Sequence, residues 1–400
     1  MSDSGLKRIN SGVRTLGWAS LLTDVSSDMI YPLLPDFLTR TLGAGPAVLG
    51  LIEGIAESTA SITKVLSGSW SDRAGRRKPL VVAGYSVAAV ARPLVGLATA
   101  WAHVLAIRFA DRVGKGIRTA PRDALIADLT PPEGRARAFG LQRAMDNAGA
   151  VIGPLVAAAL LRILPGGERS VFLLALFPGL AAVALIVWRV RERAVAEAPI
   201  ARPPLEAPPA TSLPRSLWIV TGIFLLFTLA NSTDAFLLLR ARDCGVPLWQ
   251  IPLLWSFFHA VKASAGVPGG ALADRIGRVP AVALGWAVYV AAYAGFAYVE
   301  RASTLWALFA LYGLFFALTE GAERALVAEL AGARLRGRAF GVFHGAIGLA
   351  SLPASVLFGV CWNVYGARAA FLIGAALASL ALAALLAARS RLRPAAGLAA

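Results

Sequence analysis

Helix-length apolar runs recur along this 400-residue chain, separated by short polar and charged segments. Period-two alternation is absent and Ala and Leu dominate the runs, so the pattern predicts helices rather than strands. A helix needs roughly 20 residues to cross a bilayer. We predict twelve transmembrane helices, at residues 15–38, 47–67, 79–100, 102–125, 138–162, 170–190, 216–240, 248–271, 280–299, 303–328, 339–364 and 367–388.

Two kinds of segment occur twice at nearly one spacing, which indicates two homologous halves. The pattern G-x-x-[SA]-D-R-x-G-R occupies 68–76 and again 270–278, with Asp72 and Asp274 separated by 202 residues. Arg-Ala-Phe-Gly occurs at 137–140 and again at 338–341, an offset of 201. We therefore predict an N-terminal six-helix bundle at 1–190 and a C-terminal one at 215–400. The Pro- and charge-rich stretch 191–214 between them is predicted to be a linker.

Composition agrees with a membrane protein, since 57% of the residues are hydrophobic and the net charge is +16. The Lys and Arg residues lie mostly in short loops, which is the positive-inside pattern, so no nucleic-acid partner is expected. This pattern places both termini, the linker and both Asp-Arg motifs in the cytoplasm, in a bacterial-type inner plasma membrane. The two cysteines, Cys244 and Cys361, exclude a disulfide framework and a thiolate metal site.

Two further glycine-containing motifs lie in the predicted fourth and fifth helices. Arg112-Val-Gly-Lys-Gly116 carries Arg-x-x-x-Gly in the predicted fourth helix, and Gly149, Gly153 and Pro154 form G-x-x-x-G-P in the fifth. Together with twelve helices, two halves and the Asp-Arg motifs after helices 2 and 8, they resemble the major facilitator superfamily. The resemblance covers essentially the whole chain. It implies secondary transport through a central cavity lined by helices 1, 4, 7 and 10, and the fifth-helix motif resembles that of drug–proton antiporters.

The Asp-Arg segments are predicted to form a cytoplasmic latch. A carboxylate can cap the N-terminus of a facing helix, where N–H groups and the helix dipole favour it. The resemblance places helix 11 opposite Asp72 and helix 5 opposite Asp274, and Arg73 and Arg76 are expected to pair with Asp123 or Asp128. The predicted latch residues are Gly68, Asp72, Arg73, Gly75, Arg76, Asp128, Asp274, Arg275, Gly277 and Arg278. The alternative is that these are interfacial charges that only set orientation.

The glycines of the fifth helix also have two interpretations. Small residues four apart allow two helices to approach closely, and Pro154 removes a backbone hydrogen bond and kinks the helix. The motif is either a plain tight helix crossing or a hinge that sets the contact between the two halves.

Ionisable residues inside the spans are candidates for the chemistry of transport, because charge is costly there and usually functional. Our leading hypothesis is an Asp28–Arg112 pair whose strength changes with protonation. The candidate cavity residues are Asp28, Glu57, Arg112, Asp234, Lys262, Glu320, Tyr31 and Asn231; less central are Asp24, Glu53, Arg108, Asp111, Lys115, Asp146 and Glu323. Trp255, Phe258, His259, Tyr312 and Phe316 are candidates for shaping a substrate site. For each of them the alternative is ordinary helix packing or a satisfied structural pair.

These observations predict a monomeric secondary transporter that exports a small organic solute in exchange for protons. The alternative is proton-linked movement of an organic anion or zwitterion in either direction. Enzyme activity is not expected, because the three histidines lie on different helices without metal-ligand spacing, and neither a cofactor nor a metal is predicted. A receptor or scaffold that does not transport is the hypothesis from a different class.

Overall fold

The computed structural model describes residues 9–74, 76–192 and 213–392, with every side chain in these ranges except those of Asp72, Ala74, Ala333 and Arg334. Within these ranges all regular secondary structure is helical, and no strand occurs. This confirms the predicted all-α fold. Most of the predicted linker (193–212) and the motif residue Gly75 lie outside the described residues, so the exact boundary between the halves stays a prediction.

The first half follows the predicted order of six membrane helices. Its elements are α2 (Ser11–Ile30), η1 (Tyr31–Leu33), α3 (Leu34–Asp36), η2 (Phe37–Thr41), α4 (Pro46–Ala74), α5 (Lys78–Ala91), η3 (Arg92–Leu97), α6 (Trp101–Asp128), η4 (Pro132–Gly134), α7 (Arg135–Ile163), α8 (Gly167–Leu174) and α9 (Leu176–Arg189). The irregular turns of the first helix follow from Pro32 and Pro35, which lack the N–H that a regular helix needs.

The second half repeats this plan. Its elements are α10 (Arg215–Ala230), α11 (Ala235–Asp243), η5 (Leu248–Gln250), α12 (Ile251–Ile276), α13 (Arg278–Tyr298), α14 (Ala302–Ala388) and η6 (Arg389–Leu392). The long α14 contains three successive helices, because Gly332 and Gly366 adopt φ of +65° and +84° and break it. L-residues rarely adopt this left-handed conformation, whereas glycine does so at no steric cost.

Among the residues that the structure describes, seven helical stretches are long and apolar enough to span a membrane by length and composition. The break at Gly366 divides the last of them, 335–392, into two spans, which makes eight. The four predicted spans that fail this test belong to α2, α4, α6 and α12. The predicted spans in α2, α4 and α6 each contain two or more charged residues, and the one in α12 contains Lys262 and His259, so polar residues lower the hydropathy of all four.

One predicted boundary is wrong in the same way in both halves. The two Asp-Arg segments were expected to be loops after helices that end at 67 and 271, but α4 continues to Ala74 and α12 to Ile276. Charged side chains on the last turns reach water, so the helix can extend beyond the apolar run. Gly277 then ends α12 with φ of +94°, which explains the second glycine of that motif.

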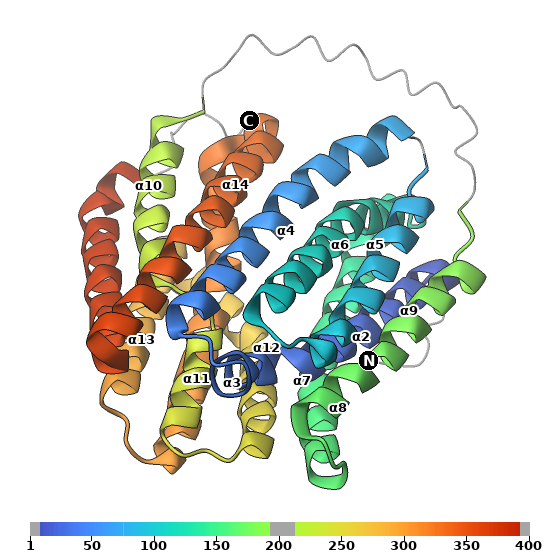
Figure 1. Ribbon diagram of the computed structural model, residues 1–400. Helices are drawn as coiled ribbons and strands as arrows, with labels where there is room; N and C mark the ends of the chain where they lie inside the picture. The colour runs from blue at the N-terminus through green and yellow to red at the C-terminus, as the bar shows by residue number, and fades with distance from the viewer. Residues whose placement is uncertain (1–8, 75, 193–212, 393–400) are drawn as a thin grey trace.

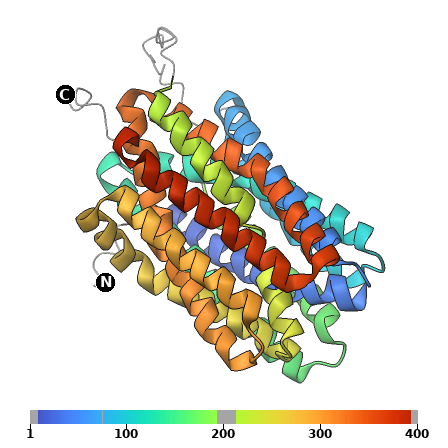
Figure 2. The ribbon, with the colours of Figure 1, turned by 90° about the vertical axis from the view of Figure 1, so that its left-hand side faces the viewer.

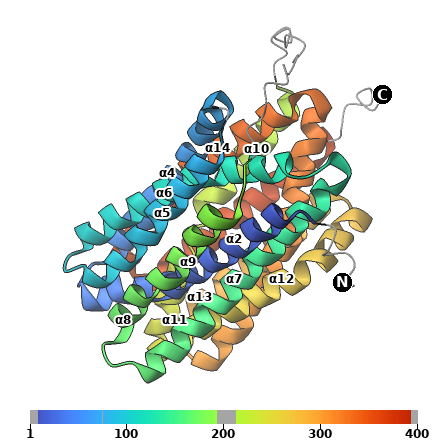
Figure 3. The same cartoon turned by 90° about the vertical axis from the view of Figure 1, so that its right-hand side faces the viewer.

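The two halves lie side by side, with α10, α11, α13 and α14 on one side and α5 to α9 on the other (Figure 1). Figure 2 shows the outer surface of the C-terminal half, and Figure 3 that of the N-terminal half. The halves meet where α4 packs on α14 and where α7 packs on α12. We call the end of the molecule where α9 ends and α10 begins the linker side, and the opposite end the far side.

Contacts between repeat-related residues locate the pseudo-symmetry axis. The hydroxyl of Tyr31 lies 3.4 Å from that of Thr233, and the Arg40 guanidinium donates to the Arg242 carbonyl at 3.3 Å. Both pairs are 202 residues apart, the offset that relates the two Asp-Arg motifs. Residues related by a two-fold rotation can touch only near the axis, so the axis runs between the far-side parts of the first and seventh helices.

Candidate functional site

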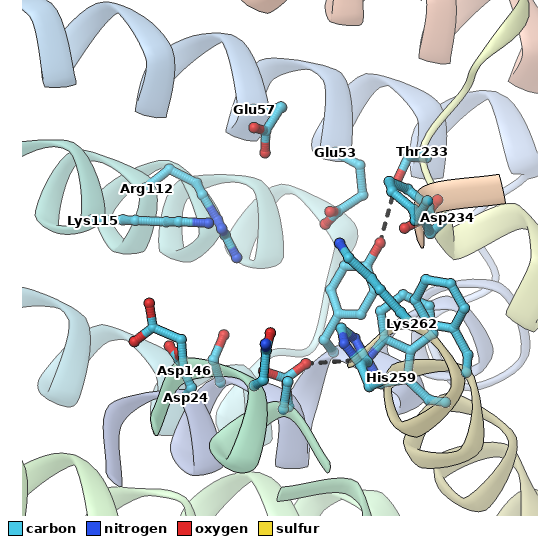
Figure 4. Close-up of a pocket in the computed structure, with 18 of the residues that line it drawn as sticks. Asp24, Glu53, Glu57, Arg112, Lys115, Asp146, Thr233, Asp234, His259 and Lys262 are labelled. Atoms are coloured by element: carbon cyan, nitrogen blue, oxygen red, sulfur yellow. Dashed lines mark hydrogen bonds between the residues drawn. The ribbon is translucent and has the colours of Figure 1, made fainter. Parts of the chain in front are cut away.

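A polar cavity of about 650 Å³ lies between the two halves (Figure 4). Of the predicted cavity residues, Asp28, Tyr31, Glu57, Arg112, Asn231, Asp234 and Lys262 line it, together with Trp255, Phe258, His259 and Phe316. It extends from Tyr31 and Asp234 toward Arg122 and Arg143, near the linker-side ends of α6 and α7. The sequence therefore identified most of the wall from single residues within apolar runs.

Helix α6 supplies the basic wall of the cavity, with Arg108, Arg112, Lys115, Arg118 and Arg122. Their spacing of three or four residues places them along one side of the helix. Because this side faces the interior of the protein rather than lipid, the charges are tolerated in a membrane span.

One buried carboxylate serves three of the arginines around α6. Asp111 is fully buried and lies 2.7 Å from Arg92 Nε, 3.3 Å from Arg112 Nε and 3.5 Å from Arg108 Nη1. Arg108 also forms a forked pair with both carboxylate oxygens of Glu53 at 2.7 Å. Such pairs must remain complete, since removal of one partner leaves an uncompensated buried charge.

The predicted Asp28–Arg112 pair is wrong for this structure. Arg112 contacts Asp111, its neighbour in sequence, and Asp28 instead accepts a hydrogen bond of 3.1 Å from the Trp255 indole. The physical reason is that Asp111 lies nearer to the guanidinium than any carboxylate of α2. Asp28 is therefore held by a side chain of the other half and keeps no ion pair in the described part of the chain.

The seventh helix is interrupted where it borders the cavity. α10 ends at Ala230 and α11 begins at Ala235, and all four intervening residues, Asn231, Ser232, Thr233 and Asp234, line the cavity. Asp234 accepts a hydrogen bond of 2.5 Å from the Tyr312 hydroxyl. Interrupted membrane helices are tolerated where they border a cavity, and in transporters they often form the binding site.

An ion-pair cluster joins the two halves on the far side of the cavity. Buried Asp36 lies 2.7 Å from Arg242 Nε and 3.1 Å from Arg40 Nε, and Arg40 also lies 3.5 Å from Asp243. We call these four residues the far-side seal. The sequence analysis did not predict this cluster, because Asp36 and Arg242 lie more than 200 residues apart.

Predicted cavity residue Glu320 lies in a bridge between the halves instead of on the cavity wall. Its carboxylate pairs with Arg143 of α7, with Lys262 of α12 at 3.2 Å and with Arg324 at 2.8 Å. The bridge lies beside the cavity, because Arg143 and Lys262 both line it.

The predicted latch pairs differ from those in the structure. Arg77, rather than Arg73 or Arg76, lies 2.9 Å from Asp128, and Arg73 and Arg76 are exposed. Asp123 pairs with its neighbour Arg122 at 2.9 Å.

The second copy of the motif is paired within itself. Asp274 pairs with Arg278 four residues later, rather than with helix α7, and Arg275 is exposed. Gly68 lies inside α4, while Gly75 and the Asp72 side chain lie outside the described residues. The carboxylate-to-helix contacts expected of the latch therefore stay a prediction.

The fifth-helix glycines form a tight crossing within one half. A Cβ atom on Gly149 would lie 2.6 Å from the Leu21 carbonyl oxygen, and one on Gly153 would lie 2.7 Å from that of Val25, both on α2. The geometry agrees with the packing interpretation. Pro154 lies within α7, which remains continuous from Arg135 to Ile163.

The close contact between the halves uses other glycines, which the sequence analysis missed. A Cβ atom on Gly54 would lie 2.9 Å from Leu352 Cα, and one on Gly359 would lie 2.6 Å from the Pro46 carbonyl oxygen. The signal was present in the sequence, since Gly50 and Gly54 are small residues four apart on α4. Arg92, Arg118 and Asp36, buried at 4%, 5% and 5% exposure, were also missed, although each is a charge within or next to a predicted span.

Comparison with known proteins agrees with this geometry. The family model described as "Major Facilitator Superfamily" matches residues 16–299 and 250–399. An uncharacterised MFS-type transporter, MJ1317 of Methanocaldococcus jannaschii, is 34% identical over 378 residues, which cover 93% of each chain. A multidrug resistance protein, MdtH of Photorhabdus laumondii, is 32% identical over 158 residues, which cover 38% of this chain and 39% of that protein.

A solved structure shares the fold. A bacterial homolog of the human lysosomal transporter Spinster, in an inward-facing and occupied conformation, superposes with a TM-score of 0.78. The two chains are 16% identical, and the match covers 95% of this chain and 96% of the other. At this identity the likeness concerns the fold alone.

Proposed function

Because this chain belongs to the major facilitator superfamily, we propose that it is a proton-coupled secondary transporter that exports a small organic solute by alternating access. The observation that carries the proposal is a set of four carboxylates on the wall of a cavity between two halves. Asp24, Asp28, Glu57 and Asp234 line this cavity without an ion pair among the described residues. A carboxylate that is not ion-paired with Arg or Lys can gain a proton without breaking a salt bridge. This property suits a proton-coupling site.

The far-side seal and the bridge at Glu320 support the alternating-access part of the proposal. Both join the two halves, and they lie at different depths along the cavity. Under the positive-inside assignment the linker side is cytoplasmic, so the seal separates the cavity from the outer surface. Transport outward then requires the Asp36–Arg242 pair to open. We place the protein in a bacterial-type inner membrane, as a monomer with both termini in the cytoplasm.

Two observations support export. The fifth-helix glycines resemble the motif of drug–proton antiporters, and part of the chain resembles a multidrug resistance protein. Accumulation in inside-out vesicles tests this direction: an imposed pH gradient, acidic inside, should drive accumulation of transported members of a compound library, read by mass spectrometry. Vesicles prepared without the protein are the control. If active and control vesicles accumulate the same compounds to the same extent, proton-coupled export is wrong.

A second candidate is proton-linked transport of an organic anion or zwitterion. It is favoured by the basic wall of α6, where Lys115 and Arg118 form no ion pair in the part of the chain that the structure describes. Uptake in right-side-out vesicles that rises with external acidity would favour this candidate over export.

We also retain the cytoplasmic latch as part of the proposed cycle. In an outward-open state, Asp72 and Asp274 would cap helices of the opposite half and close the linker side. Asp72→Asn should reduce transport about tenfold while the yield of folded protein stays unchanged. Lys64→Gln, at an exposed site on the same helix, is the matched control. A wild-type transport rate for Asp72→Asn would rule out the latch.

A further inference from the structure

The basic wall has more cationic groups than its paired carboxylates neutralise. Around α6, the five cations Arg92, Arg108, Arg112, Lys115 and Arg118 share two carboxylates within ion-pair distance, Asp111 and Glu53. This leaves hydrogen-bond donors on the cavity wall that an anion could occupy.

Three of these cations have unused donors. Arg112, 7% exposed, lies 3.3 Å from Asp111 at Nε but donates no hydrogen bond within the described residues, and Arg118, 5% exposed, has no hydrogen-bond partner there at Nη1. The Arg118 guanidinium lies 4.5 Å from the centre of the Tyr85 ring, which leaves its N–H groups available. Lys115 forms no ion pair with any carboxylate of the described residues. Buried polar groups are almost always hydrogen-bonded, so such donors indicate a missing partner.

A carboxylate of the other half, Asp234, lies across the same cavity. Figure 4 shows Arg112 and Lys115 pointing into it from α6, and Asp234 facing them from the interrupted seventh helix. Asp234 accepts only the hydroxyl of Tyr312, and its other oxygen atom has no partner in the structure described. A carboxylate with this free capacity can bind an ammonium group.

Aromatic rings occupy the wall between these charged ends. Tyr31 and Trp255 line the cavity with their ring centroids 5.1 Å apart, and they come from opposite halves. Such rings pack against the apolar or aromatic body of a small molecule.

We infer that the cavity binds a zwitterionic organic solute at two points, with its anionic group on Arg112 and Lys115 and its ammonium group on Asp234. The inference rests on the proposed transport function and names the substrate class of the same site. The two ends belong to different halves, so only a solute with both charges joins the halves through ionic contacts. A lipophilic cation would leave the donors of α6 unfilled, and a simple anion would leave Asp234 unfilled.

Thermal stabilisation of the purified protein tests this inference, since a ligand stabilises a protein in proportion to occupancy of the folded state. The probes are three zwitterions of different length: phenylalanine, para-(aminomethyl)benzoate and phenylalanylphenylalanine. Each is compared with its N-acetyl derivative, which keeps only the anion, and its carboxamide, which keeps only the cation. At least one zwitterion should bind roughly 10-fold to 100-fold more tightly than either derivative, which is the usual effect of one charge-assisted hydrogen bond.

Variants assign each end of the solute. Lys115→Gln should lower the affinity for the zwitterion to the level at which the wild-type protein binds the carboxamide. Asp234→Asn should lower it to the level at which the wild-type protein binds the N-acetyl derivative. Lys64→Gln, which removes an exposed charge outside the cavity, should change neither. If Asp234→Asn fails to fold, Tyr312→Phe tests the same end, because it frees the Asp234 oxygen and should strengthen ammonium binding.

The outcomes separate this inference from the proposed function. Equal binding of a zwitterion and one of its derivatives, or no binding of any zwitterion, overturns two-point recognition. If a singly charged derivative then drives proton flux in proteoliposomes, the proposed transport function still holds and only the two-point recognition is wrong. Selective zwitterion binding without any solute-driven proton flux would support the site and overturn proton-coupled transport.

Discussion

Buried charges gather around α6 in the N-terminal half, whereas aromatic rings fill the equivalent interior of the C-terminal half. A shared close helix contact establishes the equivalence: Gly84 packs against Arg118, and Gly285, 201 residues later, packs against Thr319, 201 residues after Arg118. With this offset, Arg92 and Asp111 correspond to Tyr293 and Tyr312. A 2.7 Å ion pair in one half therefore stands where two tyrosine rings, 6.4 Å apart, stand in the other.

This difference shows that one helix arrangement accepts two interiors of opposite polarity. In the described residues, every charged residue that is classed as buried belongs to the first half, namely Asp36, Glu53, Arg92, Arg108, Asp111, Arg112 and Arg118. Most of the largest fully buried aromatic side chains belong to the second, among them Trp286, Tyr289, Tyr293 and Tyr312. The C-terminal half thus resembles an ordinary apolar core, and the N-terminal half contains a preorganised electrostatic site.

Removal of a charge from the first half should have the largest effect. Asp111→Asn leaves Arg92, Arg108 and Arg112 without their shared counter-charge, and loss of one partner of a buried ion pair costs about 3–5 kcal/mol. Thermal unfolding in detergent should show a large loss of stability. If Asp111→Asn unfolds at the wild-type temperature, the charged interior does not stabilise the fold as the comparison requires.

The far-side seal connects the charged half to the aromatic half, and its disruption should have an effect of intermediate size. Asp36→Asn removes the negative charge that Arg242 and Arg40 share, and we expect the equilibrium to shift toward opening on the far side by about 2 kcal/mol, roughly 30-fold. Spin labels on the far-side ends of α7 and α12 should report a longer distance. An unchanged distance distribution, with folding intact, would show that the seal is not what holds this side closed.

Asp28 and Asp234, one of the four candidate coupling carboxylates from each half, allow the halves to be compared directly. Asp28→Asn should flatten the pH dependence of transport, because the carboxylate held by Trp255 can then no longer exchange a proton. Asp234→Asn should instead weaken binding and leave more of the pH dependence in place. Initial rates measured across a pH series distinguish the two variants. An unchanged pH profile in Asp28→Asn would remove this residue from proton coupling.

The smallest effect is expected at the aromatic position that corresponds to Arg92. Tyr293→Phe loses one hydrogen bond of 3.3 Å to Ser232 and keeps its ring contacts, so its cost should be about 1 kcal/mol. The measurement is the same unfolding experiment as for Asp111→Asn. A cost as large as that of Asp111→Asn would mean that the second half also depends on a polar network, and the contrast between the halves would fail.

The sequence predicted the helices, the repeat and most cavity residues, because apolar length and isolated charges are local signals. It did not predict the partners. Arg112 was assigned to Asp28 because both lie at mid-membrane depth, but Arg112 pairs with its sequence neighbour Asp111 and Asp28 accepts from Trp255 of the other half. The far-side seal depends on how the two halves pack together, which no local pattern encodes. Its one sequence signal is that Arg40 and Arg242 are separated by the 202-residue repeat offset.

The charges of α6 also bear on how the protein is made. An Arg or Lys at the centre of a helix costs about 2.5–3.5 kcal/mol on membrane insertion, so α6 alone would not be retained in the bilayer. Its counter-charges come from its neighbours: Glu53 lies on α4, and Arg92, at the end of α5, joins the network through Asp111. During synthesis α4 and α5 precede α6, and the pairing groups are therefore in place before it arrives. The nascent chain should accordingly insert these three helices as one unit, and a ribosome-bound fragment that lacks α4 should leave α6 outside the membrane.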